Sequence, residues 1–71
     1  MRRSNIKRLE GVARGLRIQL ERLEKVVEVD GDVMQPKDKF YLIDAYRYIL
    51  YTAVAMERIA NVAREDANDE V

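Results

Sequence analysis

Apolar residues recur along the first part of the chain at alternating intervals of three and four residues. This spacing is typical of a coiled-coil helix, in which one stripe of side chains faces a partner helix. It predicts a helix over about residues 5–29, with Ser4 or Asn5 as the N-cap. The stripe consists of Ile6, Leu9, Ala13, Leu16, Leu20, Leu23 and Val27.

A second apolar pattern predicts another helix over about residues 37–64. Its seam consists of Leu42, Tyr46, Ile49, Ala53, Met56, Ala60 and Ala63. A second stripe lies beside the seam, at Tyr41, Ala45, Tyr48, Thr52, Ala55, Ile59 and Val62. The far side still holds Phe40, Ile43, Leu50 and Val54. A helix that is apolar nearly all round is a buried helix, so one partner helix is too few to cover it.

Residues 30–36 form the predicted turn between the two helices. Asp30-Gly31-Asp32 is typical of a turn, because glycine accepts positive φ and aspartate bonds nearby backbone amides. Pro36 suits the first turn of the second helix, and Asp38 suits its positive end. Because the connection is short, we expect the helices to be antiparallel neighbours. The acidic residues 65–71 are predicted to form a frayed tail.

These elements predict an all-α fold with a single domain over residues 1–71, an antiparallel two-helix hairpin that oligomerises. A 71-residue chain has a marginal core, and this one lacks the cysteine and histidine that disulfides or a zinc site require. The simplest solution is a homodimer in which two hairpins close into a four-helix bundle; a larger ring or hexamer of hairpins is the alternative. The expected interface residues are Leu9, Leu16, Leu20, Leu23, Leu42, Tyr46, Ile49 and Met56.

The composition excludes most catalytic chemistry. Without histidine or cysteine, the usual general base and the best nucleophile are missing, and Ser4 and Thr52 are the only hydroxyl groups besides the tyrosines. The turn aspartates do not have calcium-loop spacing. We therefore expect no enzyme, no metal and no cofactor.

The apolar run 40–56 is short for a membrane span and is interrupted by Asp44 and Arg47. No secretory signal follows Met1. A cytoplasmic protein without membrane association is therefore expected.

Charge is distributed unevenly although the formal net charge is zero. Residues 1–25 carry eight basic against three acidic side chains, and residues 26–71 carry five against ten. Opposite its apolar stripe, the first helix holds Gly11 and Gly15 between basic flanks, and each glycine costs about 1 kcal/mol relative to alanine. A close approach by a second helix or by an anionic ligand (RNA, DNA or a nucleotide) would compensate. The candidate ligand-binding residues are Arg2, Arg3, Lys7, Arg8, Gly11, Arg14, Gly15, Arg22 and Lys25.

The same charges have a purely structural interpretation. Glu10 with Arg14, Arg17 with Glu21, and Glu21 with Lys25 have the i,i+4 spacing of pairs that solvate a helix. The basic start of the first helix, Arg2, Arg3, Lys7 and Arg8, is also expected to lie beside the acidic end of the second, Glu65, Asp66, Asp69 and Glu70. Mutual pairing would relieve two clusters that each oppose their own helix dipole.

Three residues of the second helix are secondary candidates: Asp44, Arg47 and Tyr51. Asp44 is expected to be buried, either as part of a polar ligand pocket or in an ion pair with Arg47 and a hydrogen bond with Tyr48. Tyr51 lies one turn from Arg47 on the least buried side of the helix. An aromatic residue beside an arginine can stack on a base or anchor a protein partner. Alternatively, the tyrosine ring lies at the edge of the core and its hydroxyl group is hydrated.

The layout resembles that of Rop-type plasmid regulators in having a short antiparallel hairpin, a basic first helix and an acidic tail. It is also similar to small helical-hairpin phage proteins that sequester signalling nucleotides. No motif is shared, so no functional residue is carried over. We expect a non-enzymatic homo-oligomeric interaction module of regulatory type that acts through its first helix. The alternatives are a nucleic-acid or nucleotide binder that uses the basic Gly-x-x-x-Gly face, and a protein-directed inhibitor or adaptor that exposes Phe40, Arg47 and Tyr51.

Overall fold

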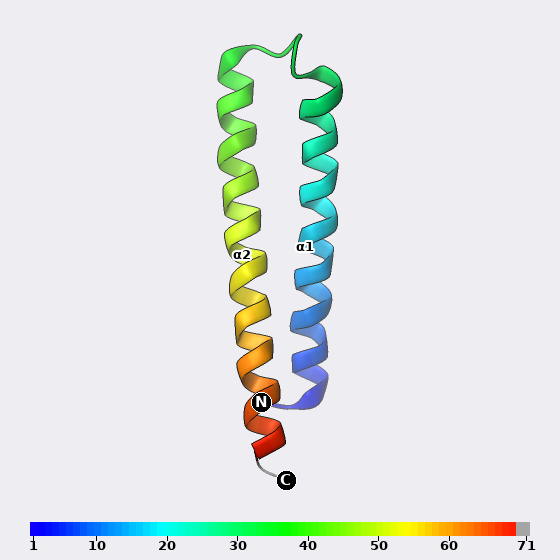
Figure 1. The fold of residues 1–71 in the computed structure, drawn as a ribbon, viewed down its shortest axis with the longest axis vertical. Helices are drawn as coiled ribbons and strands as arrows, with labels where there is room; N and C mark the ends of the chain where they lie inside the picture. The colour runs from blue at the N-terminus through cyan, green and yellow to red at the C-terminus, as the bar shows by residue number, and fades with distance from the viewer. Residues whose placement is uncertain (70–71) are drawn as a thin grey trace.

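Two long helices make up the hairpin. A computed structural model describes the backbone of residues 1–69 and the side chains of residues 1–66. Helix α1 spans Arg3–Asp30 and helix α2 spans Pro36–Asp69. They lie side by side and antiparallel, with the turn at one end and both chain termini at the other (Figure 1). The hairpin measures 56 × 15 × 13 Å. The predicted all-α fold is confirmed, and the described residues contain no strand.

Helix α1 begins earlier than its side chains suggested. Arg2 is the N-cap residue and has extended backbone, and no side chain caps the helix. The carbonyl of Arg2 accepts the backbone N–H groups of Asn5 at 3.0 Å and Ile6 at 3.1 Å. The prediction of a Ser4 or Asn5 cap was therefore wrong. Starting the helix two residues earlier gains backbone hydrogen bonds, and Asn5 Oδ1 instead accepts from Arg8 Nη1 at 3.4 Å.

Gly31 ends α1 for a different reason from the one expected. Its backbone is right-handed helical, with φ −55° and ψ −35°, and its N–H donates to the Val27 carbonyl at 2.8 Å. A Cβ atom at Gly31 would overlap with that same carbonyl oxygen. Glycine therefore permits a close approach here, and positive φ plays no part. Pro36 opens α2 and Asp38 lies in its first turn, as predicted.

Helix α2 continues to Asp69, beyond the predicted end at Arg64. Residues 65–69 contain neither glycine nor proline, so nothing in the backbone interrupts the helical hydrogen bonds. The fray predicted for the tail is therefore not seen over 65–69. Residues 70 and 71 lie outside the described residues.

The core between the helices is narrow. Its buried side chains are Ile6, Ala13 and Leu20 from α1 and Ala53 and Ala60 from α2, and each set recurs at seven-residue intervals. Alanine at the α2 positions lets the two helices approach closely.

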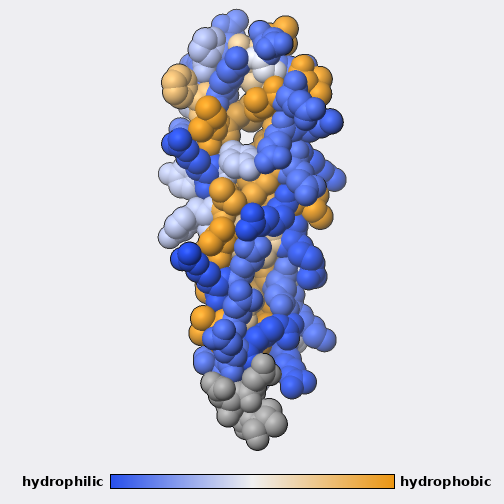
Figure 2. Space-filling model, viewed as in Figure 1, coloured by the Kyte–Doolittle hydropathy of each residue, from blue (hydrophilic) through white to orange (hydrophobic). Residues whose placement is uncertain are grey.

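Many large apolar side chains remain exposed along the hairpin. On the face shown in Figure 2, hydrophilic groups cover much of α1, and apolar groups gather between the helices in a hollow near the turn. Within residues 1–69, neither helix has a stretch both long and apolar enough to cross a membrane.

Candidate functional site

The basic candidates on α1 lie at the surface. Arg2, Arg3, Lys7, Arg8, Arg14, Gly15, Arg22 and Lys25 are exposed, and Gly11 is half-buried. Among the described side chains, the salt bridge from Lys25 Nζ to Glu28 Oε1 at 3.8 Å is the one ion pair that includes a member of this set. Within residues 1–66, no ion pair joins the basic start of α1 to Glu65 or Asp66. The side chains of Asp69 and Glu70, the other proposed partners, lie outside the described residues.

The hairpin leaves the space around the two helical glycines open. A Cβ atom added at Gly15 would meet nothing within 4 Å, and one added at Gly11 would meet only Arg14 Nη2, at 3.9 Å. Neither glycine is therefore required for α1 to pack against α2. Any close contact that these glycines serve involves a second molecule.

We expect the double substitution Gly11→Ala with Gly15→Ala to stabilise the protein by about 2 kcal/mol, because each alanine loses less backbone entropy in a helix than glycine does. Urea unfolding followed by circular dichroism measures the change. Gly31→Ala is the opposite control and should destabilise, since its new methyl group overlaps with the Val27 carbonyl. A less stable double variant, or one with an altered oligomer mass, would show instead that another chain packs against the glycines.

Ion pairs connect the two helices along one face of the hairpin. Arg17 Nη2 lies 2.7 Å from Glu57 Oε1, and Arg64 Nη2 lies 2.5 Å from Glu10 Oε1, with a second bond from each guanidinium Nε. The predicted pairs of Glu10 with Arg14 and of Arg17 with Glu21 were therefore wrong. Bidentate arginine–carboxylate geometry between helices orders both partners better than a flexible pair within one helix does. We call this side the charged face.

Hydrogen bonding to the arginines lowers the pKa of both carboxyl groups on the charged face. Arg64 lowers the pKa of Glu10 and Arg17 lowers the pKa of Glu57. A carboxyl group whose folded pKa lies below its unfolded value contributes stability above the unfolded pKa, and this contribution is lost as the pH falls through the folded pKa. The thermal unfolding midpoint should therefore drop as the pH is lowered below about 4.5. The Glu10→Gln/Glu57→Gln variant should show less of this drop. Glu21→Gln is the control, because it removes an exposed carboxylate that makes no ion pair among the described residues, and its unfolding midpoint should fall as much as that of the wild type.

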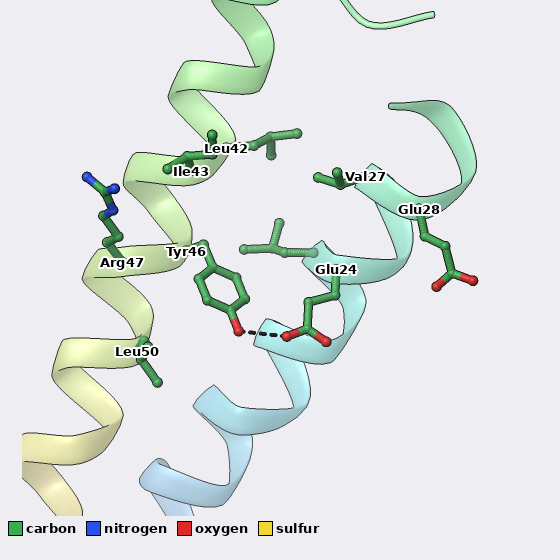
Figure 3. A pocket seen from close by; sticks show the side chains of 9 residues that line it. Glu24, Val27, Glu28, Leu42, Ile43, Tyr46, Arg47 and Leu50 are labelled. Carbon is green, nitrogen blue, oxygen red and sulfur yellow. Dashed lines mark hydrogen bonds between the residues drawn. The ribbon is translucent and has the colours of Figure 1, made fainter. Parts of the chain in front are cut away.

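A groove between the helices lies near the turn. It has a volume of about 550 Å³ and is lined mostly by apolar side chains, together with Glu24, Glu28 and Arg47. Tyr46 reaches across from α2 and donates a hydrogen bond to Glu24 Oε1 at 2.6 Å, which raises the pKa of the tyrosine (Figure 3). Arg47 points away from α1 in the same view. The groove needs both helices, so the pattern of one helix alone did not predict it.

The secondary candidates on α2 do not form a buried site in the hairpin. Asp44, Arg47 and Tyr51 are all exposed, and Tyr51 is 76% exposed. No ion pair joins Asp44 to Arg47 among the described side chains. The expectation of a buried Asp44 was wrong because the side of α2 that carries it points away from α1. Phe40 is exposed on the same outer side.

The expected interface residues follow the seam between the helices. Leu20 is buried, and the other seven, Leu9, Leu16, Leu23, Leu42, Tyr46, Ile49 and Met56, are half-buried. The leucines at 9, 16 and 23 have one side against α2 and the other side free. This leaves a further surface to be covered on the side of the hairpin opposite the charged face.

We call that surface the open face. On α2 it is the stripe of Tyr41, Ala45, Tyr48, Thr52, Ala55, Ile59 and Val62, and on α1 it is Leu9, Val12, Leu16, Gln19, Leu23 and Val26. Met1 borders a hollow with Leu9 and Val12 and another with Ile59 and Val62, so the two stripes lie on one side of the hairpin. No member of either stripe is charged. Thr52 Oγ1 donates to the Tyr48 carbonyl at 2.8 Å, so this hydroxyl group is satisfied within the helix.

Sequence reasoning recognised the α2 stripe but missed its counterpart on α1. The signal was present, because Leu9, Val12, Leu16, Gln19, Leu23 and Val26 again alternate at three and four residues. A polar Gln19 and two short valines made it weaker than the leucine seam beside it. Only the hairpin shows that both stripes lie on one face.

No group of three or more acidic residues within residues 1–66 is placed to hold a metal ion. Comparison of the chain with models of known protein families, with curated proteins and with solved structures gave no match. The open face, the basic surface of α1 and the groove near the turn are the features on which a function can be argued.

Proposed function

We propose that this protein is a non-enzymatic interaction module of regulatory type that works as a homodimer, with two hairpins packed through their open faces into a four-helix bundle. The outer surface of α1 is then presented to a further partner. The observation that carries this proposal is the uncharged apolar stripe that runs along both helices on one side of the hairpin.

The open face is too apolar and too long to be an ordinary solvated surface. On α2, Tyr41 is 62% exposed, Tyr48 is 75% exposed and Val62 is 56% exposed. Burying one large apolar side chain contributes about 1.5–3 kcal/mol, so leaving several in water is unfavourable. Contiguous apolar patches of this kind mark interaction sites on soluble proteins.

A second copy of the chain fits this surface better than a single added helix does. Both helices carry a stripe with coiled-coil spacing beside the seam that they already share, which is the pattern of helices that each have two neighbours in a four-helix bundle. The half-buried Leu16, Ile49 and Met56 would then lie at the centre. A stable interface buries roughly 800 Å² per partner, and a face with the 56 Å length and 15 Å width of the hairpin has a projected area of that order.

Sedimentation equilibrium over micromolar concentrations tests the proposal. We expect one species of twice the 8.3 kDa chain mass, with helical content that falls on dilution together with the dimer. Native mass spectrometry of the same sample also reports any co-purifying ligand. A monomer that stays fully helical at micromolar concentration would contradict the proposal, and a trimer or larger ring would replace the four-helix bundle.

A second candidate function is the binding of a nucleic acid or a nucleotide by the basic surface of α1. The supporting observation is that Lys7, Arg14 and Arg22 are exposed and make no ion pair with the described side chains. Gly15 leaves open space between these side chains. Such binding should weaken steeply with added salt, because released counterions contribute much of the affinity. Arg14→Glu should remove it without changing the oligomer mass.

A further inference from the structure

The hairpin fixes which side chains of α1 and α2 can meet. Both ion pairs between the helices, Arg17–Glu57 and Glu10–Arg64, join residues whose numbers add up to 74. Arginine and glutamate side chains of the two helices therefore meet where their residue numbers add up to this total. The relation allows the charges at the borders of the open face to be placed against those of a second copy. Any such placement rests on the proposed self-association.

Each stripe of the open face has an outer border of residues that recur at intervals of seven. Along α1 the border is Arg8, Gly15 and Arg22, and along α2 it is Asp44, Tyr51, Arg58 and Glu65. Asp66 lies one helical turn beyond Val62, the last residue of the α2 stripe. All of these residues are exposed. None of their charged side chains forms a salt bridge with the described residues of the hairpin. Their charges therefore remain available to a partner subunit.

Two-fold symmetry allows two ways of joining a pair of open faces. With the axis parallel to the helices, both turns lie at one end of the bundle and each α1 packs against α2 of the other subunit. With the axis perpendicular to the helices, the turns lie at opposite ends, and like helices pack together, α1 on α1 and α2 on α2. The border charges distinguish these arrangements.

With both turns at one end, heights are preserved between subunits. Arg8 and Asp66 of the partner subunit then also add up to 74, so their side chains can meet, and Glu65 of the partner subunit comes directly before Asp66. Arg22 lies close to the partner's Tyr51, an exposed aromatic ring suited to a cation–π contact. Gly15 lies close to the partner's Arg58 and carries no charge. This arrangement brings no like charges together.

With the turns at opposite ends, each helix meets a copy of itself in reverse. Full overlap of the hairpins puts the two-fold axis near the middle of α1, close to Gly15. Arg8 then faces the partner's Arg22 twice. Like charges therefore meet at the α1 border, and such apposition selects against a wrong arrangement.

We propose that two hairpins associate with their turns at the same end, that each α1 packs against α2 of the other subunit, and that Arg8 pairs with Asp66 and Glu65 of the partner subunit. The acidic end of α2 then neutralises the basic start of α1 between subunits. This explains why the described residues of one hairpin show no ion pair between Arg8 and those acids. The outer surface of α1, with Lys7 and Arg14, stays exposed.

The distance between the two turns tests the arrangement directly. Because the chain has no cysteine, Asp32→Cys in the exposed turn gives one spin-label site per subunit. Turns at the same end should give a label separation below about 25 Å, since neighbouring helices in a bundle lie about 8–10 Å apart. Turns at opposite ends would give at least about 40 Å, the length of the 28-residue α1 at about 1.5 Å per residue.

Charge reversal tests the pairing. We expect Arg8→Glu to weaken the dimer about tenfold, a change of about 1.4 kcal/mol. Glu65→Arg with Asp66→Arg should weaken it similarly, and the three substitutions together should restore it. Lys7→Glu is the matched control, because it makes the same change in charge on the neighbouring residue outside the open face and should leave the dimer unchanged.

The outcomes separate the two proposals. A monomeric wild type overturns the proposed function and this inference with it. A dimer with the long label separation, or with Arg8→Glu stronger than wild type, overturns only the arrangement and leaves self-association standing. A dimer with the short separation whose affinity is unaffected by Arg8→Glu overturns the pairing of Arg8. The short separation together with rescue by the triple variant supports both parts.

Discussion

Leu20→Glu is expected to unfold the protein at room temperature. Leu20 is 4% exposed and lies among the five buried side chains that form the core of the described hairpin. Removing a buried leucine costs about 2–5 kcal/mol, and burying an unpaired carboxylate costs about 3–5 kcal/mol more. A small domain has only about 5–15 kcal/mol of stability in total, so this one change removes most or all of it. Circular dichroism at 222 nm, followed during thermal unfolding, measures the loss.

Ile18→Glu is the matched control for Leu20→Glu. Ile18 lies two residues away on the outer side of α1 and is 49% exposed, so its substitution also exchanges an apolar group for a carboxylate but leaves the seam intact. It should keep the helical signal of the wild type. A Leu20→Glu variant with a wild-type unfolding curve would mean that the seam between α1 and α2 is not the core of the protein in solution.

Ile59→Glu is expected to separate the subunits of the homodimer. Ile59 lies on the open face and is 45% exposed in the single hairpin, so the hairpin itself has room for a solvated carboxylate there. In a four-helix bundle the same carboxylate would be buried without a partner, which costs about 3–5 kcal/mol. The dimer dissociation constant should therefore rise by about 100-fold or more, since about 1.4 kcal/mol corresponds to a factor of ten. Sedimentation of the wild type and the variant at several concentrations gives both constants.

Phe40→Glu shows whether this effect belongs to the open face or to apolar exposure in general. Phe40 is larger than Ile59 and more exposed, at 69%, but it lies on the outer side of α2 beyond the open face. Its substitution should leave the dimer intact and should improve solubility. If Phe40→Glu dissociates the oligomer while Ile59→Glu does not, the subunits associate through the outer side of α2 and the open face has another role.

The local structure of this protein could be predicted from its amino-acid sequence. Helical periodicity placed the two helices within a few residues of their observed bounds, except at the end of α2, and the short connection made them antiparallel. The seam could be predicted because its heptad spacing depends only on the pitch of one helix. Composition alone showed that the chain lacks cysteine and histidine, the residues that disulfides, zinc sites and many catalytic mechanisms use.

Which side chains meet across the hairpin depends on how the two helices pack. Glu10 and Arg17 each had a suitable partner one turn away in sequence, but they pair with Arg64 and Glu57, because the turn sets the register between the helices and brings these charges to one height. Asp44 looked buried from its apolar neighbours, yet α1 packs on another side of α2. A single-helix pattern gives the angle of a side chain around its own axis. The packing of a second helix against one side decides which side chains form the core, which lie on the charged face and which lie on the open face.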